Sequence, residues 1–235
     1  MEIKKHVPNA ITCCNLFSGC VACVMALQGD FHAALLFIVL GAVFDFFDGM
    51  VARLLKVSSP LGVQMDSLAD DITFGLAPAA VVFSFMRNLP LPAFMMLVAD
   101  VFPYYAFLIA VFSAVRLAKF NIDTRQTTTF IGLPTPANAL FWVSLVAGLG
   151  GWITELNAGW LLMIGLITLF AYLLVSEIPM FSLKFKSFAW EGNKARYIFL
   201  ICSIPMLLLG ITAAVAIIAW YLLLSVALYL SEKRA

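Results

Sequence analysis

Mostly apolar runs, many of them about twenty residues long, follow one another along this chain with short polar segments between them. A helix that spans a bilayer needs about 20 such residues. Charged residues make up only 11% of the chain and the mean hydropathy is +1.03, whereas a soluble domain has about 25% charged residues. The pattern therefore predicts an all-α integral membrane protein. The candidate spans are 10–28, 32–54, 61–85, 93–119, 134–152, 158–176, 196–209 and 211–230.

The last two spans come from one continuous apolar stretch, 196–230, which is too long for a single crossing. We expect it to turn near Gly210. The longest polar stretch, 177–195, precedes it. The chain is thus predicted to have a six-helix membrane core at 1–178. A cytoplasmic connector and two further C-terminal transmembrane helices, paired as a hairpin, are predicted at 179–235.

Basic residues set the expected orientation, because cytoplasmic loops are enriched in Lys and Arg. With both termini inside, 13 of the 14 basic residues are cytoplasmic and only Arg87 is outside. This predicts a multi-pass protein of the cytoplasmic (inner) membrane, and we expect no nucleic-acid partner. The inner residues are Lys4, Lys5, Arg53, Lys56, Arg116, Lys119, Arg125, Lys184, Lys186, Lys194, Arg196, Lys233 and Arg234.

Four carboxylates lie within 26 residues of the second and third apolar runs. Each costs about 2.5–3.5 kcal/mol at the centre of a bilayer on insertion scales, so a functional role is the default hypothesis. Asp45 and Asp48 are three residues apart and share a helical face; Asp66 and Asp70 are four apart and do the same. The two faces are predicted to meet near the cytoplasmic end of the bundle. A single such Asp is also common as a helix cap, and Asp71 lies off this face.

Clustered Asp side chains without His or Cys suit Mg²⁺ or Mn²⁺. Two divalent cations would balance four negative charges, and two-metal carboxylate sites recur where a nucleophile displaces a group at phosphorus. Three small residues, Gly49, Ala52 and Gly62, leave room for a ligand. Arg53 offers a bidentate phosphate contact. The sequence therefore predicts a diphosphate bound through metal.

These positions together match a known signature. It is the pattern Asp45-x-x-Asp48-Gly49-x-x-Ala52-Arg53-x8-Gly62-x-x-x-Asp66-x-x-x-Asp70, and it resembles that of the CDP-alcohol phosphotransferase family at all eight positions. The resemblance implies a six-helix membrane enzyme, usually a homodimer, in which a hydroxyl acceptor attacks a CDP-linked lipid and CMP leaves. It implies that Asp45, Asp48, Asp66 and Asp70 bind two divalent cations, with Asp70 also the general base.

Further segments resemble the branch of this family that uses CDP-diacylglycerol and L-serine. They are Pro8–Asn9 with Thr12 and Asn15, Ser67–Asp70, Phe74–Ala79, Arg116–Asn121 and Phe130–Ala137. The resemblance implies that Gly49, Ala52, Arg53 and Gly62 line the nucleotide diphosphate.

Two polar groups outside the signature are further candidates. Asn9, Thr12 and Asn15 form a stripe on the first helix that is predicted to contact the cytidine, although Asn9 after Pro8 also suits a helix start. Arg116 and Lys119, with Asn121 nearby, are candidates for the acceptor or for a lipid phosphate, and equally for topology anchors.

Two alternatives stay open at this point. Glycerol 3-phosphate or inositol phosphate are other acceptors, which would need a denser basic pocket. A cation transporter would also use intramembrane carboxylates. The transporter leaves Gly49, Ala52, Arg53 and Gly62 unexplained.

Overall fold

The computed structural model describes residues 2–123, 130–181, 190 and 193–232. Five of the basic residues that the topology prediction uses, Arg125, Lys184, Lys186, Lys233 and Arg234, lie outside the described residues. Almost all of the described chain is helical. The only strands in it are the two-residue β1 (Phe130–Ile131) and β2 (Pro179–Met180), which pair antiparallel.

Two long helices, α1 (Glu2–Leu27) and α2 (Phe31–Leu55), open the chain and pack against each other. The turn between them uses Gly29 at φ 80°, a conformation that favours glycine, and Asp30 caps α2 by accepting a hydrogen bond from the Ala33 backbone N–H over 2.9 Å. Lys56 ends α2 in the left-handed region at φ 51°.

The third span is one continuous helix with a change of winding in its middle. It runs through α3 (Pro60–Asp70), a π-helical segment (Asp71–Leu76) and α4 (Ala77–Met86). Ser59 caps its start, accepting from the Gly62 backbone N–H over 3.0 Å, and Pro60 occupies the first turn, where its missing N–H costs nothing. The π-helical segment begins directly after Asp70, and wide turns of this kind are frequent at functional sites.

The fourth span begins later than the sequence predicts, and the prediction of 93–119 is wrong at its start. Residues Ala93–Val98 form a separate 3₁₀ segment, and the helix begins with a 3₁₀ turn at Phe102–Phe107 that continues into α5 (Leu108–Ile122). Pro103 suits the first turn of a helix rather than its interior, which explains the break.

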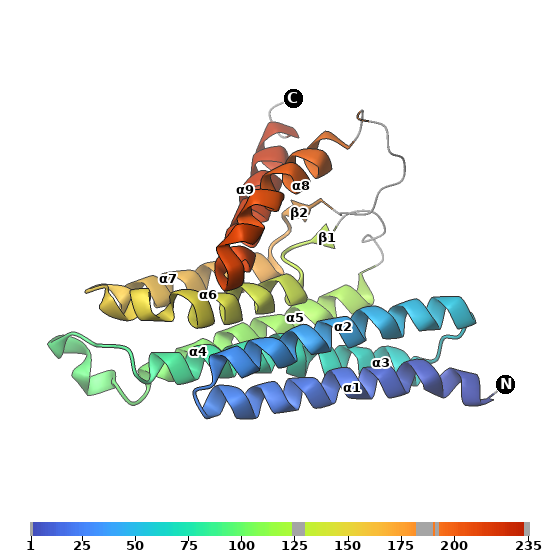
Figure 1. Cartoon of the computed structure of the whole chain (residues 1–235), viewed down its shortest axis with the longest axis horizontal. Coiled ribbons are helices and arrows are strands. Elements are labelled where there is room, and N and C mark those ends of the chain that lie inside the picture. Colours follow the sequence, from blue (N-terminus) through green and yellow to red (C-terminus); the bar gives the residue numbers. More distant parts are fainter. Residues whose placement is uncertain (1, 124–129, 182–189, 191–192, 233–235) are drawn as a thin grey trace.

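Two helices complete the bundle, α6 (Thr135–Glu155) and α7 (Gly159–Val175). Trp142 is fully buried between them, and the rings of Phe141 and Phe170 stack at 4.1 Å. In Figure 1, α1 to α7 lie along one common direction.

The predicted turn near Gly210 is present, at φ 62°. It lies inside a short 3₁₀ segment, Leu207–Thr212, which connects α8 (Lys194–Met206) to α9 (Ala213–Glu232). This hairpin rises steeply from the bundle in Figure 1. Midway along α9, the Tyr221 hydroxyl donates to the Phe181 backbone carbonyl over 3.0 Å.

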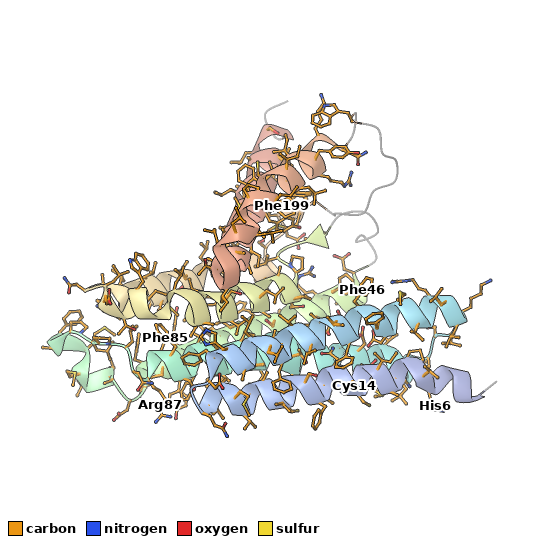
Figure 2. All side chains as sticks on the ribbon, viewed as in Figure 1. His6, Cys14, Phe46, Phe85, Arg87 and Phe199 are labelled. Carbon is orange, nitrogen blue, oxygen red and sulfur yellow. The ribbon has the colours of Figure 1, made fainter. Side chains whose placement is uncertain are left out.

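Six helical stretches of the described chain are long and apolar enough to cross a bilayer, and α7 adds a shorter apolar helix. The all-α, multi-pass membrane fold is thereby confirmed. Figure 2 places His6 and Arg87 at opposite ends of the bundle. The α2–α3 connection and the end of α5 lie at the end that holds His6 (Figure 1). The six spanning stretches are His6–Leu27, Phe31–Leu55, Pro60–Met86, Phe102–Ile122, Thr135–Glu155 and Lys194–Ser231.

Candidate active site

The carboxylates of α2 and α3 face one another, as their spacing predicts. One oxygen from each of Asp45, Asp48 and Asp66 lies within 4.8 Å of the others. Asp48 is buried, with 6% of its surface exposed, while Asp45 and Asp66 are half-buried. The last turns of α2 and the first turns of α3 thus bring three negative groups to one point near the end of the bundle.

Asp70 does not belong to that group of three. It lies one turn further along α3 than Asp66, within electrostatic range of the three other carboxylates. Its Oδ1 accepts a hydrogen bond from Asn15 Nδ2 over 3.1 Å. Asp70 is thus adjacent to the cluster but held by a contact from α1.

Asp71 points elsewhere. A Cβ added to Gly75 would lie 2.8 Å from Asp71 Oδ1 and 3.2 Å from the Ser113 side chain on α5. The carboxyl group of Asp71 is therefore directed toward α5, which agrees with its predicted place off the shared face.

The polar stripe of α1 reaches the carboxylates directly. Thr12 Oγ1 lies 2.5 Å from Asp48 Oδ2 and 3.1 Å from the Pro8 carbonyl, so its single proton can serve either acceptor. Asn15 is fully buried and does not line the pocket, which differs from the predicted cytidine contact. The stripe itself was visible in the sequence, but its contact with Asp48 and Asp70 depends on how α1 is rotated against α2 and α3.

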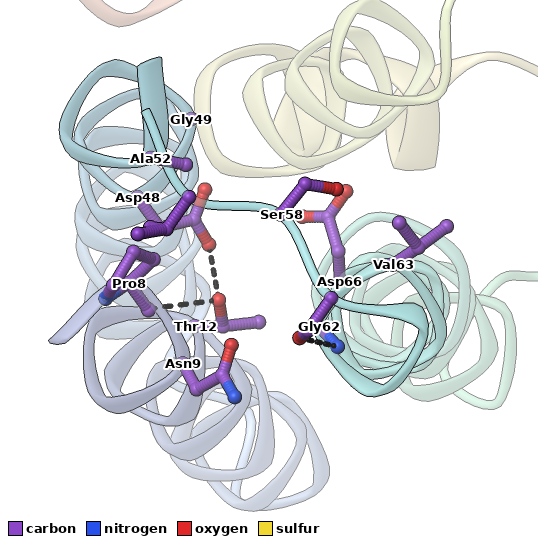
Figure 3. Close-up of a pocket in the computed structure, with 12 residues that line it drawn as sticks. Pro8, Asn9, Thr12, Asp48, Gly49, Ala52, Ser58, Gly62, Val63 and Asp66 are labelled. Atoms are coloured by element: carbon purple, nitrogen blue, oxygen red, sulfur yellow. Dashed lines mark hydrogen bonds between the residues drawn. The ribbon is translucent and has the colours of Figure 1, made fainter. Parts of the chain in front are cut away.

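A pocket opens beside the cluster, between α1, α2 and the start of α3 (Figure 3). Five of the seven residues predicted to contact the nucleotide line it, and the exceptions are Arg53 and Asn15. Sequence reasoning missed the α2–α3 connection, although its polar pair Ser58-Ser59 between the two halves of the signature was a usable signal. The pocket is lined by Pro8, Asn9, Thr12, Asp48, Gly49, Ala52, Val57, Ser58, Ser59, Gly62, Val63 and Asp66.

The small residues have two different roles here. A Cβ on Gly62 would lie 3.0 Å from Asn9 Oδ1 and 3.1 Å from Ser59 Oγ, so this glycine permits the close approach of α1. A Cβ on Gly49 would meet only Arg53 Nη1, at 3.8 Å. Gly49 therefore keeps the pocket open, with the exposed Arg53 guanidinium at its edge.

The three acceptor candidates do not converge. The buried Arg116 donates from Nε to the Leu133 carbonyl over 3.3 Å, and Lys119 Nζ donates to the Val175 carbonyl over 3.3 Å. Asn121 instead donates to Ser67 Oγ on α3 over 2.8 Å. At about 100° per residue, Asn121 lies roughly 140–160° around α5 from the two cations.

Arg116 and Lys119 line a second pocket, at the ends of α5 and α7. Two acidic side chains, Asp123 and Glu177, line the same pocket. The pocket therefore presents groups of both charge signs to a ligand.

The aspartate cluster fits a divalent cation. Its donors are carboxylate oxygens at mutual distances that one ion can bridge, and such hard oxygen donors suit Mg²⁺ or Mn²⁺. Within the described residues, no Lys or Arg lines this pocket. Asp48 and Asp66, the two aspartates that line the pocket, thus have no protein cation beside them there, and a bound divalent ion would supply the missing positive charge.

Comparison with known proteins agrees with the signature. The model of the CDP-alcohol phosphatidyltransferase family matches residues 5–171. A Bacillus subtilis (strain 168) protein named CDP-diacylglycerol–serine O-phosphatidyltransferase is 38% identical over 132 residues, which cover 56% of this chain and 70% of the relative.

Proteins of the same name from other organisms are also similar. The Mycobacterium tuberculosis (strain H37Rv) protein is 32% identical over 231 residues, covering 93% of this chain and 72% of the relative. The Saccharomyces cerevisiae protein is 36% identical over 165 residues, covering 63% of this chain and 55% of the relative. The similarity to the mycobacterial protein extends beyond the signature and into the C-terminal hairpin.

Proposed function

Since this chain belongs to the CDP-alcohol phosphatidyltransferase family, we propose that it transfers the phosphatidyl group of CDP-diacylglycerol to L-serine, giving phosphatidylserine and CMP. The observation that carries the proposal is the meeting of the α2 and α3 aspartates beside a pocket lined by the small residues of the signature. Relatives that bear the serine transferase name support the choice of serine among hydroxyl acceptors.

The proposed reaction is a single direct displacement. The serine hydroxyl oxygen forms a bond to the β-phosphorus of CDP-diacylglycerol, and the bond from that phosphorus to the bridging oxygen breaks. The bridging oxygen and its electron pair leave with CMP. Asp70 accepts the proton of the serine hydroxyl as general base, a role that suits a carboxylate beside the cluster but outside the group of three.

Asp45, Asp48 and Asp66 are the residues that would hold divalent cations, Mg²⁺ or Mn²⁺, and we assign two ions with Asp70 beside the second. When bound, such ions supply positive charge that neutralises a diphosphate and stabilises a departing phosphate. Thr12 holds Asp48 by its hydroxyl contact and so orients one of these ligands.

The pocket of Figure 3 is the proposed site of the CDP group. Asn9 and Thr12 offer amide and hydroxyl groups for the nucleotide, and the small side chains of Gly49 and Ala52 let the diphosphate approach α2 closely. Arg53 at the pocket edge would contact phosphate through its guanidinium.

The second pocket supports an amino acid acceptor over a sugar phosphate. Arg116 and Lys119 suit a carboxylate, and Asp123 and Glu177 suit an ammonium group. A phosphate dianion would be repelled by these two acidic side chains. Asn121 lies on the α3 side of α5, and we propose that it contacts the acceptor near Asp66 and Asp70.

We place both termini and the aspartate site on the cytoplasmic side of the inner membrane, because six of the nine basic residues that the structure describes lie at the site's end of α1, α2 and α5. We also propose that residues 1–178 form the catalytic core, that 179–235 form the connector and hairpin, and that the protein works as a homodimer.

The acceptor can be tested with the purified protein, CDP-diacylglycerol and Mn²⁺. We expect CMP and phosphatidylserine to form with L-serine, and no lipid product to form with glycerol 3-phosphate or inositol phosphate in its place. A lipid product only with one of the phosphorylated acceptors would overturn the serine assignment and leave the aspartate site intact. Ion flux into vesicles without CDP-lipid would instead favour a transporter.

A further inference from the structure

Asn15 contacts the proposed general base from a different helix. It lies in the middle of α1, its side chain is fully buried, and its Nδ2 donates to Asp70 Oδ1 over 3.1 Å. A carboxylate has two oxygens, and this hydrogen bond occupies one of them. The other oxygen of Asp70 is then directed by the bond that Asn15 makes.

The position of Asn15 is itself constrained on two sides. Thr73, one turn beyond Asp70, donates from Oγ1 to the Asn15 backbone carbonyl over 3.1 Å, and this contact is buried. On α2, a Cβ added to Gly41 would lie 3.0 Å from Asn15 Oδ1 and 2.5 Å from Thr73 Cγ2. Asn15 therefore fits only because α2 has no side chain at this point and because Thr73 anchors α1 to the Asp70 helix.

The hydrogen bonds of the Asn15 side chain contribute little to the stability of the fold. Its Oδ1 is buried without a hydrogen-bond partner. A buried polar atom left without a partner costs free energy, and an apolar side chain of similar size would avoid that cost. The amide orientation follows from Asp70, because a flipped amide would turn its oxygen toward a carboxylate oxygen. The contact with Asp70 is thus the one described feature that explains an amide at this position.

We propose that Asn15 is a positioning residue, which holds the Asp70 carboxylate in the orientation needed to accept the proton of the acceptor hydroxyl. This inference rests on the proposed function. In this proposal Asn15 orients the general base and does not contact the nucleotide, because Asn15 does not line the pocket while Asn9 and Thr12 do.

The test compares Asn15→Leu with the parental protein in three measurements: kcat for serine-dependent CMP release, the Kd for CDP-diacylglycerol, and the melting temperature. We expect kcat to fall about 10- to 100-fold, the usual cost of losing a residue that orients a ligand or base. We expect the Kd to change less than about threefold, and the melting temperature to stay the same or rise.

Two pairs of variants test the contacts of Thr73 and Gly41 that hold Asn15 in place. Thr73→Val removes the hydroxyl and should lower kcat, while Thr73→Ser keeps it and should restore most of the rate. Gly41→Ala should lower kcat by displacing Asn15, whereas Gly165→Ala on α7 should not, because nothing lies within 4 Å of its added Cβ. Ser18→Ala, a buried change nearly one turn along α1, is the control for α1 packing.

The outcomes separate the two proposals. A parental protein that releases no CMP with serine would overturn the proposed function and this inference with it. An active parental protein with an unchanged kcat in Asn15→Leu would overturn the inference alone. Equal losses in kcat and in CDP-diacylglycerol affinity would make Asn15 a nucleotide contact, and a lower melting temperature with unchanged kcat would make it structural.

Discussion

At the level of single residues, four chemically identical side chains have different surroundings. Asp45, Asp48 and Asp66 have oxygens within 4.8 Å of one another, whereas Asp70 lies outside that group and accepts a hydrogen bond from α1. This difference in environment separates the proposed metal ligands from the proposed base.

Asp70→Asn keeps the size of the side chain and its contact with Asn15 but removes the proton acceptor. We expect kcat to fall by about 10²- to 10⁴-fold, the usual contribution of a general base. The Kd for CDP-diacylglycerol should stay within about threefold of the parental value. Equal losses of binding and turnover would argue against the base role.

Gly62→Ala tests the close approach of α1 to α3. Its Cβ would press on Asn9 Oδ1 and Ser59 Oγ, two walls of the pocket, so we expect CDP-diacylglycerol to bind roughly tenfold more weakly, or about 1.4 kcal/mol. Gly165→Ala is the matched control and should bind normally, with slightly higher stability from the better helix propensity of Ala. Unchanged affinity in Gly62→Ala would show that α1 can move away from the added Cβ without affecting the pocket.

Residue spacing predicted much of this site, and its limits have a physical cause. The intervals between Asp45, Asp48, Asp66 and Asp70 define helical faces, since helix geometry is local. The contacts of Thr12 and Asn15 with these carboxylates are not local. They depend on the rotation of α1, which is set by close packing at Gly41 and Gly62.

At the level of elements, the start of α3 is important for the site because it fixes the positions of Asp66 and Asp70 further along the same helix. Ser59→Ala removes the cap, and we expect a loss of about 1 kcal/mol of stability together with a lower kcat/KM. Asp30→Ala removes the equivalent cap of α2 at the far end of the bundle and should cost similar stability with normal kcat/KM. Equal activity in both variants would contradict a special role of the α3 start.

The apolar runs predicted the end of α1, both ends of α2 and the start of α3 to within one residue. The segment at 93–101 was not predictable, because its apolar composition matches a span while Pro103 favours a new helix start. The π-helical turn after Asp70 has no local signature in composition. It coincides with contacts from α1 and α5 to Thr73 and Gly75.

At the scale of the whole molecule, six of the nine basic residues that the structure describes lie at the end of the bundle that holds the aspartates: Lys4, Lys5, Arg53, Lys56, Arg116 and Lys119. The direction of the α8–α9 hairpin could not be predicted. Its apolar residues have no helical periodicity that would show which face of each helix packs against the bundle. In the structure the turn of the hairpin packs against α6, and the contact of Tyr221 with Phe181 holds it midway along α9.

The orientation can be checked by labelling single cysteines in a variant that lacks the five native ones. We expect a membrane-impermeant maleimide to label Arg87→Cys in intact cells and Lys56→Cys only after the membrane is opened, because positive charge gathers on the cytoplasmic side. The reverse labelling pattern would invert the proposed topology.

The central claim is that the aspartate cluster transfers a phosphatidyl group to serine with the help of divalent cations. The most direct measurement is CMP release by the purified protein from CDP-diacylglycerol, with and without L-serine, before EDTA, after EDTA and after Mn²⁺ is restored. We expect CMP to form only when serine and the divalent cation are both present, and Mn²⁺ to restore the rate lost to EDTA. CMP release that persists in EDTA, or that needs no acceptor, would contradict this claim.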